Sequence, residues 1–186
     1  MKRVAGTKAG KNAVRVPRRS YFKCTHGILH SDNDTCKNIN EYTILMDVKL
    51  SGEGAHGFFQ TNMDNTEDFD VFLFSDMLRF GISQFDCRID PPLRENEWYR
   101  LVISARLGQS LKFYLNGELV FAGYRAEQLI RDGRLSWSKE GLLLFADDTG
   151  NDSDMDVSEV AIFNRALSDE EAFSLGAAGD ELKTKN

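Results

Sequence analysis

Residues 98–117 read WYRLVISARLGQSLKFYLNG, and this stretch decides the fold class. Apolar and polar side chains alternate through WYRLVISARL and again through LKFYL, with the period of two that is typical of half-buried strands. Asn116 and Gly117 follow, and both residue types tolerate the positive φ that a two-residue hairpin turn requires. Together with the next alternating run, residues 119–121, the stretch predicts an antiparallel β-hairpin.

Similar short runs occupy much of the rest of the chain. The run YTILMDVKL at residues 42–50 places apolar side chains on one face and polar side chains on the other, which predicts a half-buried strand. Further strands are expected at residues 69–74, 78–82 and 142–145, between clusters of Gly, Asn, Asp and Pro. Many short strands at regular spacing predict an all-β sandwich or barrel.

Only the segment RALSDEEAFSLG, near the end of the chain, is typical of a helix. Ser168 can cap its first turn, Glu171 completes a capping box three residues later, and a glycine ends it. Ala172, Phe173 and Leu175 give the helix a narrow apolar face. We expect that face to pack on the edge of the sandwich.

Length and composition limit the class of protein. The chain has 186 residues, of which 41% are hydrophobic, and a net charge of −6, as expected for one globular domain. No apolar run approaches the roughly 20 residues of a membrane helix, so no membrane span is expected. We expect a basic flexible arm at residues 1–12, a β-sandwich domain at 13–176 and a polar tail at 177–186.

The basic arm begins MKRVAGTKAGKNAV. No long apolar stretch follows its positive residues, so no secretory signal is expected within the chain. No aromatic residue is interleaved with the positive charges, so nucleic acid is not expected as a partner. The arm can instead contact other protein subunits.

Two stretches resemble the laminin-G-like domains of the concanavalin A-like lectin and glucanase families. In residues 98–117 an aromatic-rich strand leads through a short turn into LKFYLNG, and in residues 141–176 a buried strand ends in acidic residues before a second strand and the helix start FNRALSDEE. The resemblance covers about residues 13–176. It implies a jelly-roll sandwich of two antiparallel sheets with one short C-terminal helix, often with one bound calcium, attached to larger surface or carbohydrate-active proteins as a recognition module.

The acidic stretch DDTGNDSDMD at residues 147–156 is the candidate metal site. Calcium binds about six to eight oxygen ligands, which clustered carboxylates and loop carbonyls can supply. An EF-hand is excluded because Ser153 stands where its loop needs glycine. The candidate ligands of a structural calcium ion are Asp147, Asp148, Asn151, Asp152, Asp154 and Asp156. The alternatives are a solvated turn and a loop that rests on Lys or Arg partners.

A second polar loop, QTNMDNTEDFD at residues 60–70, is a candidate ligand-binding loop. Its candidate residues are Asn62, Asp64, Asn65 and Asp68. Asn and Asp also favour turns for local reasons, because their side chains bond their own backbone. If both polar loops lie on the same rim of the sandwich, their side chains can share one site.

Aromatic residues are the other candidates for ligand contact. Sugar recognition places Trp or Tyr on a loop or open face, where the flat ring stacks on a pyranose. Trp137 and Tyr124 are the best candidates for that role, whereas Phe69, Phe72 and Phe74 lie on strands and are expected in the core.

Catalysis by a glycoside hydrolase requires two carboxylates that face the same groove, and on a strand this needs acidic residues at even spacing. Three pairs have that spacing: Asp68 with Asp70, Glu95 with Glu97, and Asp154 with Asp156. Each pair lies at a strand end or in a loop. We therefore expect no catalytic residues and no enzyme.

The three cysteines cannot all pair within one chain. Cys24 and Cys36 flank a polar loop, and they can either close it as a disulfide or stay as two free thiols. With His26 and His30 they also form a set of zinc-type ligands, but the spacing matches no known zinc motif.

These features predict a non-catalytic recognition module that binds glycans or glycosylated surfaces with the help of calcium, with a carbohydrate or glycoprotein as its partner. The expected location is extracellular or at the cell surface, as part of a larger protein. An alternative from another class is a structural or adhesion protein that mediates protein contacts, such as a phage virion decoration protein. A polysaccharide hydrolase or lyase is the second alternative.

Overall fold

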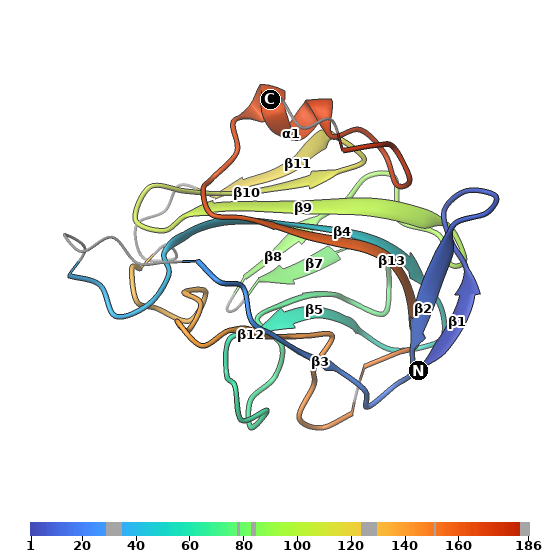
Figure 1. Ribbon diagram of the computed structural model, residues 1–186, viewed down its shortest axis with the longest axis horizontal. Helices are drawn as coiled ribbons and strands as arrows, with labels where there is room; N and C mark the ends of the chain where they lie inside the picture. The colour runs from blue at the N-terminus through green and yellow to red at the C-terminus, as the bar shows by residue number, and fades with distance from the viewer. Residues whose placement is uncertain (29–34, 78, 83–84, 124–129, 151, 183–186) are drawn as a thin grey trace.

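The computed structural model describes residues 1–28, 35–77, 79–82, 85–123, 130–150 and 152–182. They form two antiparallel sheets, packed face to face, and one short helix (Figure 1). The predicted all-β sandwich is confirmed. Within these ranges there is no helix with the length and apolar character that a bilayer crossing needs.

The larger sheet has seven strands in the order β1-β2-β13-β4-β9-β10-β11. Its strands are β1 (Lys2–Ala5), β2 (Asn12–Val16), β4 (Glu41–Leu50), β9 (Trp98–Arg106), β10 (Ser110–Leu115), β11 (Glu118–Gly123) and β13 (Met155–Phe163). The smaller sheet has six strands in the order β3-β12-β5-β6-β7-β8. Its strands are β3 (Phe22–Cys24), β5 (His56–Gln60), β6 (Val71–Leu73), β7 (Arg79–Ile82), β8 (Phe85–Arg88) and β12 (Leu142–Leu144).

The predicted hairpin joins β10 to β11. Leu115 pairs with Glu118, so the turn contains two residues. Asn116 has φ of 50° and Gly117 has φ of 86°, as the twist of a tight hairpin requires. This part of the prediction is confirmed.

The core lies between the two sheets and is built on β4. The inward side chains of this strand, from Tyr42 to Leu50 at every second position, are almost fully buried. The indole of Trp137 is also fully buried and stacks on Tyr42 with ring centroids 3.7 Å apart. Tyr42 Oη donates to the carbonyl of Leu135 at 2.8 Å, which satisfies the one polar atom of its ring.

The outer face of the seven-stranded sheet is covered as well, because helix α1 (Asp169–Ser174) and the chain before it lie on it (Figure 1). The residues in this second cluster are Leu45, Val102, Tyr114, Leu167, Ala172 and Leu175. Strand β4 is therefore buried on both faces, and not on one face as the alternation predicted. Phe173 was expected in this contact but is 70% exposed.

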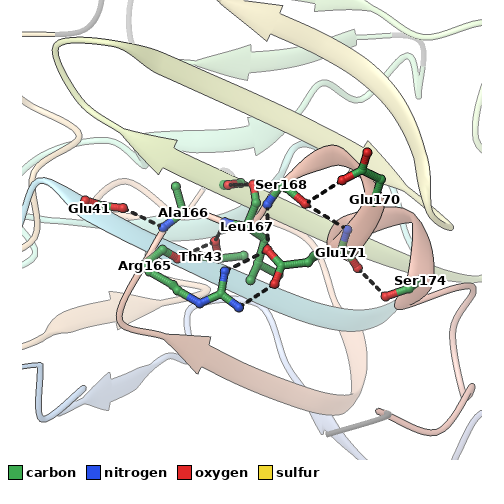
Figure 2. Close-up of polar contacts among 10 residues, drawn as sticks. Glu41, Thr43, Arg165, Ala166, Leu167, Ser168, Glu170, Glu171 and Ser174 are labelled. Carbon is green, nitrogen blue, oxygen red and sulfur yellow. Dashed lines mark hydrogen bonds and ion pairs between the residues drawn. The ribbon is translucent and has the colours of Figure 1, made fainter. Parts of the chain in front are cut away.

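The predicted capping box of α1 is present (Figure 2). Glu171 N donates to Ser168 Oγ at 3.2 Å, and Ser168 N donates to Glu171 Oε2 at 2.9 Å. Arg165 then holds the same Glu171 carboxylate through two hydrogen bonds of 2.7 Å. Thr43 Oγ1 on β4 donates to the carbonyl of Arg165 at 2.8 Å, so the approach to the helix is bonded directly to the sheet.

Both ends of the chain are bonded to the larger sheet where the structure describes them. Instead of a mobile arm, residues 2–16 form the hairpin β1–β2, closed by a hydrogen bond of 2.9 Å from Gly6 N to Lys11 O. The backbone amides and carbonyls of β2 pair with β13, whereas those of a free arm would hydrogen-bond only to water. At the other end, Gly179 N donates to the Asp47 carboxylate at 2.8 Å, so the start of the polar tail is bound to β4.

A buried ion pair anchors this C-terminal segment. Arg100 on β9 donates from Nε and Nη2 to the two oxygens of Asp47 at 2.7 and 2.9 Å, and both side chains are fully buried. The remaining donors of Arg100 bond the carbonyls of Leu175 and Asp180. Two charges in the interior are tolerated only when each is paired and hydrogen-bonded, and here both conditions are met.

We expect Arg100→Leu to lower the free energy of unfolding by about 3 kcal/mol or more, because it leaves the Asp47 carboxylate buried without its partner. Arg106→Leu is the matched control on the same strand, since Arg106 forms an exposed pair with Glu41. That pair contributes about 1 kcal/mol or less. Urea denaturation of the two variants measures the difference, and equal losses would contradict the assigned role of Arg100.

Candidate functional site

The two polar loops of the sequence meet on one side of the sandwich. Asn65 Nδ2 in the first loop donates to the main-chain carbonyl of Asp147 in the second loop at 3.3 Å. Asn62 shapes the first loop from within, because its Oδ1 accepts from the amides of Asp64 and Thr66 at 3.0 and 3.4 Å. Asn62 therefore acts as a turn residue, and the side chain that reaches the second loop is Asn65.

Three carboxylates converge where the loops meet, and we call them the acidic cluster: Asp68, Asp147 and Asp148. One oxygen of each lies within 4.8 Å of the others. Asp147 is only 6% exposed, whereas Asp68 and Asp148 are exposed. Burial raises the pKa of Asp68, and a hydrogen bond to Asp147 and the charges of Asp147 and Asp148 raise it further. Each carboxylate of the cluster thus makes ionisation of its neighbours less favourable.

The acidic cluster has the chemistry of a hard-cation site. Carboxylate oxygens are the ligands that calcium prefers, and it tolerates irregular arrangements of about six to eight oxygens. Asp68 comes from the first loop, and Asp147 and Asp148 follow strand β12. A cation held here would link the two loops and offset their repulsion.

The later acidic residues of the second loop bond the N-terminal segment instead. Asp156 lies on β13, where Arg15 reaches it at 2.6 Å and Lys49 at 2.9 Å. Burial raises the pKa of Asp156, but the hydrogen bonds from Arg15 and Lys49 outweigh that effect and hold it below its usual range. The prediction of Asp156 as a calcium ligand is wrong, because two cations already neutralise it.

Asp154 and Asp152 bond backbone amides of the same segment. The amide of Arg18 donates to Asp154 Oδ1 at 2.9 Å, and the amide of Arg19 donates to Asp152 Oδ2 at 2.9 Å. These two carboxylates fasten the chain between β2 and β3, and they lie outside the acidic cluster. The alternative of a loop that rests on arginine partners thus describes the later half of the stretch. Asn151 lies outside the described residues.

Trp137 does not offer a surface to a ligand. Its ring lies in the core between Tyr42 and His26, with centroids 3.7 and 5.7 Å away. The prediction that it stacks on a sugar is wrong, because a fully buried indole cannot reach solvent. Tyr124, the other aromatic candidate, lies outside the described residues.

Phe72 and Phe74 were expected in the core but are half-buried, and with Phe69, which is buried as predicted, they form an aromatic surface. We call Phe69, Phe72 and Phe74 the phenylalanine platform, and their ring centroids are 4.8 and 4.7 Å apart. A Cβ atom at Gly81 would lie 2.2 Å from the Phe72 ring, and one at Gly57 would lie 2.4 Å from the Phe69 ring. The rings therefore lie directly on the backbone of β5 and β7, in space that only glycine leaves free.

The platform faces away from the core. Val71 and Leu73 on β6 belong to the core between the sheets, so alternation turns Phe72 and Phe74 to the outer face of the six-stranded sheet. Both rings are half-buried and reach solvent. The sequence contained a signal for this, because neighbouring apolar residues of one strand cannot all point into a two-layer core.

Charged groups border the platform on both sides. The guanidinium of Arg79 lies 4.3 Å from the centroid of Phe74, and Asp76 and Asp86 hold it at 2.9 and 2.8 Å. At the other end, Phe69 follows Asp68 of the acidic cluster directly in the chain. The outer face of the six-stranded sheet therefore carries apolar ring surface next to carboxylates.

Asp70 has a structural role beside this surface. It is almost fully buried, and its oxygens accept from the amide of Thr61 at 2.6 Å and from Arg134 Nε at 2.5 Å. Burial raises the pKa of Asp70, and the bonds from Thr61 and Arg134 offset part of that rise. These contacts hold the base of the first loop, so Asp70 is not paired with Asp68 across a groove.

Cys24 and Cys36 form no disulfide with each other, so the disulfide alternative for this pair is not realised in the structure. His26 Nε2 donates to the carbonyl of Ser138 at 2.7 Å, and Ile28 N donates to His26 Nδ1 at 3.0 Å. These bonds occupy both ring nitrogens of His26. The fourth residue of the zinc alternative, His30, lies outside the described residues.

Comparisons with known proteins agree with this architecture. The model of the Concanavalin A-like lectin/glucanases superfamily matches residues 24–172. Searches of curated proteins find no match by sequence.

Solved structures with the same fold are 11–19% identical to this chain, which supports the fold alone. Domain 4 of AbnA, a GH43 extracellular arabinanase from Geobacillus stearothermophilus solved with arabinotriose, has a TM-score of 0.61 at 19% identity, over 95% of this chain and 82% of that chain. The CBM40 of Ruminococcus gnavus IT-sialidase, bound to α2,3-sialyllactose, has a TM-score of 0.61 at 11% identity, over 88% and 96%. The receptor-binding domain of botulinum neurotoxin C/D mosaic serotype has a TM-score of 0.63 at 15% identity, over 94% of this chain but 44% of that chain.

We expect Asp68→Asn to stabilise the metal-free protein at pH 7 by up to about 1 kcal/mol, because it removes one of three repelling charges at an exposed position. The pKa of Asp68 is raised in the folded state, so Asp68 binds a proton more readily in the folded chain than in the unfolded chain. As the pH falls through the folded pKa toward the unfolded pKa, Asp68 becomes protonated and the wild type loses the repulsion that destabilises it. The advantage of the variant should therefore shrink toward pH 4, which is near the usual pKa of Asp.

Urea denaturation in a chelator at several pH values measures this advantage. Asp64→Asn is the control, since Asp64 is exposed in the same loop but outside the acidic cluster. A loss of stability in Asp68→Asn at pH 7, or the same pH profile in both variants, would contradict the repulsion within the cluster.

Proposed function

The chain belongs to the Concanavalin A-like lectin/glucanases superfamily, and from this premise we propose that it is a non-catalytic module that recognises carbohydrate on the outer face of its six-stranded sheet. The observation that carries the proposal is the phenylalanine platform on this face, with Phe69 directly after Asp68 of the acidic cluster in the chain. The target is a glycan or a glycoprotein, and we place it at an extracellular or cell surface.

The chemistry of a sugar ring matches this surface. One face of a pyranose is formed by C–H groups and packs on an aromatic ring, while its hydroxyls need donors and acceptors at the edge. Phe72 offers the ring, because Gly81 lets it lie against β7 and the side chain is half-buried rather than enclosed. The exposed carboxylates of Asp68 and Asp148 offer acceptors for hydroxyl groups beside the platform.

We also propose that calcium occupies the acidic cluster. The ion would take one oxygen from each of Asp68, Asp147 and Asp148, with carbonyls and waters as the remaining ligands. Its contribution is structural and electrostatic, because it would fix the first loop to the second and change the charge that a bound glycan meets. The protein's own contacts between the loops include a hydrogen bond of 3.3 Å from Asn65 to the carbonyl of Asp147.

The geometry favours binding over hydrolysis. A glycosidase holds its two carboxylates on either side of the scissile bond. Here Asp68, Asp147 and Asp148 converge on one another, and Asp70 is committed to Arg134. The AbnA domain in complex with arabinotriose and the CBM40 bound to α2,3-sialyllactose support a binding role.

We expect millimolar calcium to raise the melting temperature of the wild type. A ligand at a hundredfold excess over its Kd stabilises the folded state by about 2.7 kcal/mol. The double variant Asp147→Ala with Asp148→Ala should lose the shift, and Asp64→Ala should keep it because it lies outside the cluster. Differential scanning calorimetry in calcium and in chelator measures the effect. Coincident curves for the wild type would remove calcium from the proposal.

We expect a glycan array to identify a carbohydrate ligand, and Phe72→Ala to weaken its binding by roughly tenfold, because the stacking ring supplies an apolar contact of about 1.5 kcal/mol. Phe173→Ala is the matched control, since Phe173 is an exposed ring on α1, far from the platform in the fold. Titration calorimetry with the array hit measures both variants.

An unchanged affinity in Phe72→Ala would overturn the proposed binding surface. Cleavage of the bound glycan by the wild type would overturn the non-catalytic role. The array is run with calcium and with chelator. A glycan that binds in chelator would show that carbohydrate recognition does not depend on the proposed metal site.

A further inference from the structure

An apolar groove of about 560 Å³ lies at the side of the sandwich where the six-stranded sheet ends. One wall is the inward face of β2 and β13, where Val14 and Val160 are each 38% exposed and Ile162 is half-buried. The opposite wall is β3, with Phe22 and its neighbours. The larger sheet thus extends past the smaller one and leaves branched apolar side chains that β3 does not cover.

Strand β3 is also the end of its sheet. It pairs with β12 on one side (Figure 1), and in the described part of the chain no strand pairs with its other side. Residues of β3 line the groove. The backbone amides and carbonyls along such an edge can pair with another extended chain. A groove bounded by an open strand edge therefore fits an added β-strand better than it fits a helix.

The side chains of β3 define which strand would fit. Phe22 and Cys24 pack against the core, whereas Lys23 points to the other face and is exposed. In an added strand, the residues opposite Phe22 and Cys24 would enter the groove and meet Val14 and Val160. The residue opposite Lys23 would lie beside its ammonium group in solvent, where a carboxylate is the favourable neighbour.

We propose that β3 is a docking edge for an extended segment of a partner protein with the pattern apolar–acidic–apolar. The segment adds a strand beside β3, inserts its two apolar side chains into the groove and pairs its acidic side chain with Lys23. Main-chain hydrogen bonds supply affinity and the alternate side chains supply selectivity. This surface is separate from the phenylalanine platform, which lies on β5 to β7, so it serves a protein partner whether or not the chain binds carbohydrate.

The probe is a pair of peptides, acetyl-Ser-Val-Glu-Val-Ser-amide and acetyl-Ser-Val-Lys-Val-Ser-amide, titrated to millimolar concentration into 15N-labelled full-length chain. We expect the glutamate peptide to shift the amide signals of residues 22–24 and of Val14 and Val160, and to bind about threefold tighter than the lysine peptide, as expected for one cross-strand charge pair. A glutamate peptide that is N-methylated at its glutamate should lose binding, because β12 already bonds the backbone of Phe22 and Cys24, and the amide opposite Lys23 is the donor that faces β3 in an added strand.

Charge reversal supplies the matched test. Lys23→Glu should reverse the preference between the two peptides, whereas Lys11→Glu, in the turn between β1 and β2, should leave it unchanged. Amide shifts confined to residues outside the groove, equal affinities of the two peptides for the wild type, or no shift at millimolar peptide would overturn the proposal. Because Lys23 is exposed, the variant is expected to fold, and its spectrum reports this directly.

Discussion

The burial of β4 on both faces is the constraint on which the rest of the fold depends. Its inward residues meet the six-stranded sheet, and its outward residues lie under the C-terminal segment. The outer face contains Asp47, whose charge requires Arg100 from β9 and the amide of Gly179. The last part of the chain therefore covers both the ion pair and the apolar side chains on the outer face of the sheet. Without that cover, these groups would be exposed to water.

The packing of the sandwich determines the geometry of the proposed binding surface. Burial of β12 places Asp147 just after the strand, and the bond from Arg134 to Asp70 holds the base of the loop that carries Asp68. The same acidic stretch is divided between two roles, since Asp156 is neutralised by Arg15 on β2. Charge pairing along β13 thus leaves the start of the stretch for the acidic cluster, while its end fastens the N-terminal hairpin to the sheet.

Two kinds of surface result from the unequal size of the sheets. The smaller sheet presents the phenylalanine platform on its outer face, and its last strand, β3, leaves part of the larger sheet uncovered. Both surfaces combine apolar side chains with nearby charge, but the chemistry differs. The platform offers ring faces, which suit a compact ligand with a flat apolar side, whereas β3 offers a backbone edge, which suits an extended chain.

The sequence alone determined the features that depend on neighbouring residues. Period-two alternation identified β4, β9 and β10, and the Asn116–Gly117 pair identified the hairpin of β10 and β11. Ser168 with Glu171 identified the helix start. Each of these signals is complete within a few positions. The tertiary structure decided which side chains of distant segments meet. It brought Asp68 to Asp147, buried Trp137 and turned Phe72 outward, since these outcomes depend on strand order and on which face of each sheet is covered, and spacing along the chain does not encode either.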